Sequence, residues 1–154
     1  MTALDDELVD ALMTASRALV AIAARSLDGV DDKVSLPQYR ALVVLAGHGP
    51  QRVSDLAGTL EIHQSTTSRL CDRLADRDLV ERRRSPESRR EVFVALTEPG
   101  RTLVAEVTKR RRVELRRVAL RVADPDRPAV AAAFHAFAEA AGELPDDAWR
   151  LGWA

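Results

Sequence analysis

The sequence predicts a mainly helical protein with one small β-hairpin, an α+β fold formed by a single domain of residues 1–154. Three observations lead to this fold class. Apolar residues recur at helical spacing through most of the chain. Two short helical runs, residues 53–60 and 65–78, are separated by only four residues. Two β-type runs joined by a turn-forming loop follow directly, which predicts the hairpin.

Length and composition limit the possible classes of protein. A chain of 154 residues with 46% hydrophobic residues has enough apolar content for one ordinary core. The formal net charge of −1 excludes a wholly basic nucleic-acid coat protein. The charge is unevenly distributed, because residues 1–50 carry seven acidic and four basic residues whereas five arginines fall within residues 82–90. The segment of residues 82–90 therefore concentrates positive charge.

The cysteine content and the N-terminal sequence indicate in which cell compartment the protein is expected. The single cysteine, Cys71, excludes an intrachain disulfide and a cysteine-rich metal site. The N-terminus begins acidic, with Asp5, Asp6 and Glu7, and lacks the apolar segment of a signal peptide. No run approaches the roughly 18 apolar residues of a membrane span. We therefore expect a cytoplasmic protein without a membrane partner.

The first two helices follow from apolar spacing and helix-end signals. Residues 4–27 form a long amphipathic run that ends before Gly29. Ser35 is a good helix cap, with a proline in the first turn and Gln38 in the capping-box position. The helix that follows stops at the Gly47 segment and is apolar enough to be packed in the core.

The next two helices, residues 53–60 and 65–78, are joined by a tight break. In the second of them Leu70 and Leu74 are one turn apart, so the opposite face is polar. That face offers hydroxyl, amide and guanidinium groups, on Gln64, Ser65, Thr66, Ser68, Arg69 and Arg73. Such side chains can read base edges and phosphates in a major groove of DNA. Two helices with this arrangement are typical of a helix-turn-helix.

The β-type runs, residues 79–83 and 91–96, flank a basic, turn-forming loop of residues 84–90. A hairpin placed directly after a recognition helix is a wing. Its arginines are numerous enough to follow phosphates or to enter a minor groove, and Arg89 is expected to enter it. The wing residues that we expect to contact DNA are Arg84, Ser88, Arg89 and Arg90. Residues 35–100 are thus predicted to form a winged helix-turn-helix core.

Two further helices are predicted after the wing. Thr97 caps a long helix of residues 98–122, which a proline-containing segment ends. A final helix, residues 129–141, is expected to bury Val130, Ala133, Phe134, Phe137 and Ala138. A tail containing Trp149, Leu151 and Trp153 follows.

The terminal segments, residues 1–30 and 101–154, carry apolar stripes that the winged core does not need in order to close. Large exposed apolar patches are rare on monomers, so we expect these helices to join two copies in a homodimer. The alternative is that they pack only on their own winged core. A homodimer would read a near-palindromic double-stranded DNA operator.

Several segments together resemble the MarR (multiple antibiotic resistance regulator) family of winged-helix transcription factors. The matching segments are residues 36–42, 53–57, 65–70, 72–74, 79–82, 88–90 and 96–100. The flanking helices also fit, so the resemblance covers essentially the whole chain. It implies a dimer with interleaved terminal helices and, in many members, a pocket for small aromatic or anionic compounds.

Three positions depart from the family pattern. Ser88 stands where the family usually carries an aspartate that braces the wing arginine, and Glu87 or Glu91 is placed to substitute for it. Glu61 and His63 replace the common glycine and serine of the turn, which removes the usual cap of the recognition helix. We therefore expect a wing that is mobile in the free protein and becomes ordered on DNA.

A small ligand is the expected second partner. The candidate pocket residues are Arg17, Tyr39, His48 and Arg111, since an aromatic plate with a cation suits a phenolic acid. The alternative to a ligand pocket is that Tyr39 is a core residue and Arg17 a surface charge. Arg111 interrupts an apolar seam in residues 104–122, so we expect it to pair with a carboxylate or a bound anion.

The sequence shows no catalytic constellation, no HExxH pattern and no phosphate-binding glycine loop, so an enzyme, a metal site and a cofactor are not expected. Cys71 lies beside Leu70 and Leu74 and is expected to be inert. We predict a sequence-specific DNA-binding transcriptional regulator, a homodimeric repressor released by a small ligand. The alternative is a ligand-independent autoregulatory or architectural DNA-binding protein, which a pocket filled by side chains would favour.

Overall fold

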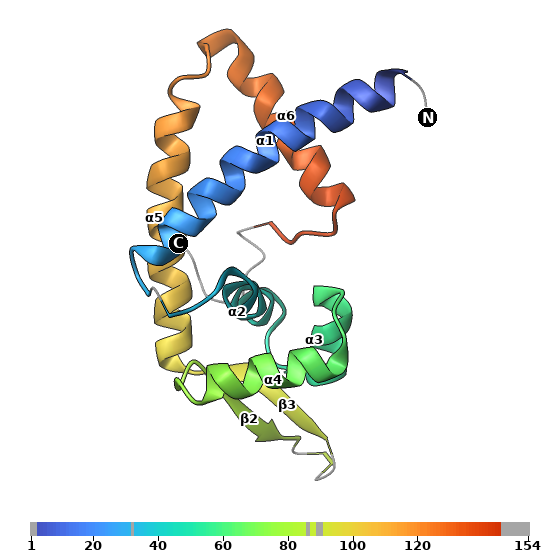
Figure 1. Ribbon diagram of the computed structural model, residues 1–154, viewed down its shortest axis with the longest axis vertical. Coiled ribbons are helices and arrows are strands. Elements are labelled where there is room, and N and C mark those ends of the chain that lie inside the picture. The colour runs from blue at the N-terminus through green and yellow to red at the C-terminus, as the bar shows by residue number, and fades with distance from the viewer. Residues whose placement is uncertain (1–2, 32, 86, 89–90, 146–154) are drawn as a thin grey trace.

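The fold is mainly helical, as Figure 1 shows for a computed structural model that describes residues 3–31, 33–85, 87–88 and 91–145. The elements follow in the order α1 (Ala3–Asp28), α2 (Leu36–His48), β1 (Gln51–Arg52), α3 (Val53–Leu60), α4 (Gln64–Ala75), β2 (Val80–Arg84), β3 (Val92–Leu96), α5 (Glu98–Ala119), η1 (Asp124–Asp126) and α6 (Arg127–Ala140). The predicted α+β class with a helix-turn-helix and a wing is confirmed.

The sheet has three antiparallel strands in the order β1-β3-β2. The hairpin register pairs Val80 with Leu96 and Arg84 with Val92, so the loop between them begins at the end of β2. Strand β1 pairs Arg52 with Phe93. The sequence analysis did not predict β1, because a strand of two residues is too short to show alternation.

Helix α2 begins as its capping signal predicts. The side-chain oxygen of Ser35 accepts a hydrogen bond from the Gln38 backbone at 3.3 Å, and Gln38 Oε1 accepts one from the Ser35 backbone at 2.9 Å. This reciprocal pair satisfies donors that the first helical turn leaves free. Seven residues of α2 are buried, which confirms the prediction that this helix lies in the core.

Helix α4 is shorter than the predicted run of residues 65–78. It ends at Ala75, and the chain reaches Asp78 in the left-handed conformation, with φ of 57°. The Leu79 N–H then donates to the Leu74 carbonyl at 3.0 Å, as in a Schellman ending of a helix. Helical spacing alone did not reveal this end, because Asp78 adopts a conformation more often taken by glycine.

The core lies where α2, α3, α4 and the sheet meet, and it also includes residues of the terminal helices. Leu27 of α1 and Val104 of α5 belong to the same cluster of buried side chains as Leu42 and Leu74. Helix α5 begins close to the sheet, because a Cβ at Gly100 would lie 2.0 Å from the Leu79 carbonyl oxygen. The winged core is therefore tied directly to α1 and α5.

The expected burial within α6 of Val130, Ala133, Phe134, Phe137 and Ala138 is not found among the residues that the structure describes. Helix α6 has no buried residue, and Val130, Phe134 and Phe137 are 37%, 40% and 48% exposed. Figure 1 shows that α6 folds back from the far end of α5. Its main contacts are with η1, the turn that directly precedes it, so its apolar side chains stay exposed. Trp149, Leu151 and Trp153 lie outside the described residues.

Hydrogen bonds and ion pairs hold α6 at its two ends. At its start, Arg127 Nε donates to the Val122 carbonyl at 3.1 Å. Beyond its end, Arg40 Nη1 on α2 donates to Glu143 Oε2 at 3.1 Å. None of the helices in the described part of the chain is long and apolar enough to cross a membrane.

Candidate nucleic-acid interface

One face of α4 is anchored in the core. Thr67 and Leu74 have no exposed surface, Cys71 is 1% exposed and Leu70 is 8% exposed. Their spacing of three and four residues places them on one side of the helix. Since this side is buried, the rotation of α4 about its axis is fixed.

The opposite face of α4 therefore points away from the core, and it carries the predicted base-reading residues. Gln64, Ser65, Thr66, Arg69 and Arg73 are exposed and Ser68 is half-buried, so all six lie at the surface. Arg69 Nε donates to the Ser65 carbonyl at 3.3 Å, which lays this guanidinium along its own helix in the free chain. The face thus combines hydroxyl, amide and guanidinium donors on one rigid element, as major-groove recognition needs.

The N-terminus of α4 lacks a side-chain cap in the described structure. His63 occupies the cap position without a capping hydrogen bond, as the departure at this position predicts. The backbone is supported from within the helix instead, because Thr67 Oγ1 donates to the His63 carbonyl at 3.1 Å. The N–H groups of the first turn are left for an external acceptor, and a DNA phosphate is a suitable one.

An ion pair ties the wing to the recognition helix. Arg82 Nη2 on β2 donates to Asp72 Oδ1 on α4 at 2.5 Å. Arg83 pairs with Glu81 on the same strand. Two of the wing arginines are therefore engaged by carboxylates, whereas Arg84 is exposed at the end of β2.

The loop of the wing is described only in part. Ser88 accepts a hydrogen bond from the Glu91 backbone through its carbonyl oxygen at 3.1 Å, and Ser85 donates from its N–H to the Glu91 carbonyl at 2.9 Å. Arg89 and Arg90 lie outside the described residues. Glu91 pairs with Arg52 of β1. The expected brace of a wing arginine by Glu87 or Glu91 stays a prediction.

A second ion pair positions the far end of α4. Arg77 Nη2, just beyond the helix, donates to Asp31 Oδ2 in the segment between α1 and α2 at 2.5 Å. Burial of the Asp31 carboxyl acts to raise its pKa, but the hydrogen bonds from Arg77 and from the Lys33 backbone outweigh it, so the pKa is lowered. This pair and the Schellman ending fix the point where the chain leaves the recognition helix.

The structure separates the four expected ligand-pocket residues. Tyr39 is buried, and the Arg111 guanidinium carbon lies 5.3 Å from the centre of its ring. His48 Nδ1 lies 3.1 Å from the Val44 carbonyl, and Arg17 bonds the Thr14 hydroxyl, so both make these contacts within their own helices. Of the four, only Tyr39 and Arg111 are brought together.

Arg111 contacts Tyr39 and no carboxylate in the described part of the chain, and the expected bound anion stays a prediction. Its guanidinium lies over the Tyr39 ring, and its Nε is buried without a hydrogen-bond partner in the described structure. The Tyr39 hydroxyl lies 3.5 Å from Thr108 Oγ1. Burial raises the pKa of Tyr39, although the Thr108 hydrogen bond and the Arg111 charge oppose the rise. The Arg111 guanidinium therefore lies against the Tyr39 ring with its Nε hydrogen-bond donor unused by the described residues.

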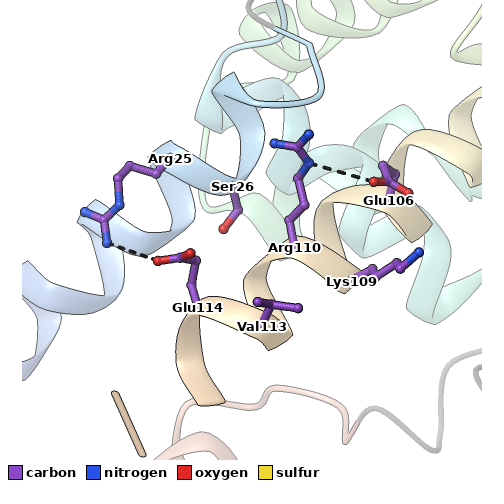
Figure 2. Close-up of a pocket in the computed structure, with 7 residues that line it drawn as sticks. All are labelled: Arg25, Ser26, Glu106, Lys109, Arg110, Val113 and Glu114. Carbon is purple, nitrogen blue, oxygen red and sulfur yellow. Dashed lines mark ion pairs between the residues drawn. The ribbon is translucent and has the colours of Figure 1, made fainter. Parts of the chain in front are cut away.

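A cavity of about 410 Å³ lies elsewhere, between the end of α1 and the middle of α5. Figure 2 shows its lining residues, which are Arg25, Ser26, Glu106, Lys109, Arg110, Val113 and Glu114. Two loose ion pairs cross or border it, Arg25 with Glu114 at 3.9 Å and Arg110 with Glu106 at 3.8 Å. Three cations and two carboxylates thus line this cavity, and sequence reasoning missed it because α1 and α5 are far apart in the chain.

Cys71 is placed as its neighbours predict. It is 1% exposed, and burial raises the pKa of its thiol, with Arg82 opposing the rise and Asp72 adding to it. A buried thiol with a raised pKa is a poor nucleophile. Within the described residues no group of three or more histidine, cysteine, aspartate or glutamate side chains could hold a metal ion.

The fold and this surface define a winged helix-turn-helix protein, with a recognition helix and a basic wing on adjacent elements. The model of the MarR family matches residues 34–92, which span the helix-turn-helix and most of the wing. The chain belongs to the MarR family, whose members are transcriptional regulators and not enzymes.

Three known proteins illustrate the similarity. RV1404 from Mycobacterium tuberculosis, known from a crystal structure, is 42% identical in sequence to this chain. The match covers 95% of this chain and 99% of the RV1404 chain, with a TM-score of 0.88. The HTH-type transcriptional regulator YfiV of Bacillus subtilis is 36% identical over 84 residues, 54% of this chain and 52% of YfiV. A mutant of MepR from Staphylococcus aureus, solved with an oligodeoxyribonucleotide, is 18% identical, covers 86% of this chain and 96% of that chain, and shares the fold with a TM-score of 0.64. The matches span little more than half the length of the curated relatives.

Proposed function

We propose that this protein is a sequence-specific, double-stranded-DNA-binding transcriptional regulator that acts as a homodimer. The observation that carries the proposal is the orientation of α4, whose buried face fixes the helix so that its polar face is presented to solvent. The wing lies beside α4 and is tied to it through Arg82 and Asp72. A recognition helix in the major groove and a basic wing on the flanking phosphates or minor groove suit this arrangement.

Apolar residues exposed on three helices support the homodimer. They are Leu8, Val9, Met13, Leu19 and Val20 on α1, Val113, Leu115 and Val118 on α5, and Val130, Phe134 and Phe137 on α6. Exposed apolar surface on this scale is typical of an interface and unusual on a monomer. Because one two-fold axis relates both copies, their recognition helices would meet half-sites of opposite orientation.

The cavity between α1 and α5 supports release of DNA by a small anionic ligand. Arg25, Lys109 and Arg110 offer positive charge there, and Val113 offers apolar surface. A carboxylate that draws these cations together would change how α1 packs against α5, and both helices share the core of the winged part. At Tyr39, the direct contact with the Arg111 guanidinium instead favours the ligand-independent alternative.

Repression is the regulatory direction that we propose. A dimer that occupies an operator prevents other proteins from using the same DNA, and loss of binding then relieves the block. Repression follows from the proposed DNA binding alone and needs no further structural feature.

The first prediction concerns specificity. The Arg69→Ala variant should lose about 1–3 kcal/mol of binding free energy on the preferred DNA site, because a guanidinium that reads a base is removed. Competition binding should show a smaller loss on random DNA. Arg121→Ala, an exposed arginine beyond α5, is the matched control and should bind as the wild type does. An equal loss on both DNAs would mean that Arg69 contacts phosphates only.

The second prediction concerns assembly. Sedimentation equilibrium at micromolar concentration should give twice the 16.9 kDa mass of one chain. Phe134→Asp should shift the equilibrium toward the monomer, because a charge would enter the apolar interface. Ala136→Asp places the same charge about half a turn away on α6 and should remain dimeric. A monomeric wild type would contradict the proposed homodimer.

The third prediction concerns the ligand. Phenolic acids titrated into the protein–DNA complex should release the DNA, since a carboxylate can bind the cavity cations. The Lys109→Ala/Arg110→Ala variant should bind DNA normally but lose this response. Arg121→Ala should keep it. If no phenolic acid at millimolar concentration releases the DNA, the ligand-independent alternative holds.

A further inference from the structure

Arg52 joins three parts of the DNA-binding region. It is the last residue of β1, it precedes the first residue of α3 directly, and it lies opposite Phe93 of β3 in the sheet. Although Arg52 occupies the cap position of α3, its side chain makes no capping hydrogen bond. The guanidinium is therefore available for contacts across the sheet.

Those contacts are made to the base of the wing. Arg52 Nη2 donates to Glu91 Oε1 at 2.6 Å. The Arg52 guanidinium carbon also lies 5.6 Å from the centre of the Phe93 ring. An ion pair fixes the direction of the guanidinium and the ring supports it from one side, so both contacts act on the same strand.

Glu91 is the residue at which the loop of the wing returns to the sheet. Its N–H donates to the Ser88 carbonyl at 3.1 Å, and its carbonyl accepts from the Ser85 N–H at 2.9 Å. The backbone of Glu91 thus closes the loop while its carboxylate is held by Arg52. A change in the position of Glu91 would change the direction in which the loop leaves the sheet.

The two strands of the wing are tied to different helices of the helix-turn-helix. The pair between Arg82 and Asp72 joins β2 to α4. The pair between Arg52 and Glu91 joins the residue that precedes β3 to the end of β1, directly before α3. Both pairs are partly exposed, with 47% of the Arg52 side chain and 40% of the Glu91 side chain accessible, so they contribute little to folding stability.

We propose that Arg52 is a positioning residue, which holds the wing at the angle needed for DNA by binding Glu91 and Phe93, and is not itself a phosphate ligand. This inference rests on the proposed DNA binding. Its consequence is that Glu91, an acidic residue beside a basic loop, assists DNA binding although its charge repels phosphate.

The Glu91→Gln variant separates this positioning role from simple electrostatics, because the two explanations predict opposite changes in DNA affinity. Removal of a negative charge near DNA should tighten binding if the charge alone matters. If Glu91 and Arg52 hold the wing, the variant should bind about tenfold more weakly, because a charge-assisted contact to DNA is lost in each of the two subunits. The salt dependence should also fall by about 2 per dimer, because one wing contact per subunit is lost.

Two further variants test Arg52, the ion-pair partner of Glu91. Arg52→Lys keeps the positive charge but loses the planar group that pairs and stacks, so it should weaken binding as Glu91→Gln does. The double variant Arg52→Glu/Glu91→Arg should recover most of the affinity that Arg52→Glu alone loses. Tighter binding by Glu91→Gln, wild-type binding by Arg52→Lys, or failure of the double variant to recover would each overturn the inference.

Urea unfolding of each variant gives the control for folding. The midpoints should stay near that of the wild type, while affinity and salt slope change. A midpoint that falls in proportion to the affinity would indicate a merely structural role and would also overturn the inference. A wild-type protein without sequence preference for any DNA would contradict the proposed function itself, which is a separate outcome.

Discussion

The burial of one side of α4 is the constraint on which the DNA-binding surface depends. Thr67, Leu70, Cys71 and Leu74 lock the helix into the core, and each large apolar side chain buried in this way contributes about 1.5–3 kcal/mol. Because the helix cannot rotate, the polar residues opposite are presented together. The missing side-chain cap at His63 is tolerated since tertiary packing, rather than the cap, holds the helix in place.

Ion pairs around α4 fix the positions of the wing and of the segment between α1 and α2 relative to this helix. Arg82 joins the wing to Asp72, and Arg77 joins the end of the recognition helix to Asp31 between α1 and α2. The core continues from α4 into α1 and α5, whose outer halves expose apolar side chains. A partner that covers those halves, or a ligand between α1 and α5, would therefore act on the same rigid unit that carries the recognition helix.

Local signals made much of the fold predictable. Ser35 and Gln38 form the predicted capping box, and the buried and polar faces of α4 follow the helical spacing of Leu70 and Leu74. Contacts between distant segments could not be predicted in the same way. Arg52 and Glu91 are 39 residues apart in sequence, and only the sheet register brings them together. The amphipathic pattern of α6 indicated an apolar face, but it could not show that this face is left exposed in the described part of the chain.

The central claim is that a fixed recognition helix on each of two related copies reads DNA. Selection of bound DNA from a random pool tests it most directly, because the enriched sequence reports both specificity and symmetry. We predict two inverted half-sites whose centres are about one helical turn apart, each read in the major groove. Enrichment of a single asymmetric element, or no enrichment over the starting pool, would contradict the claim.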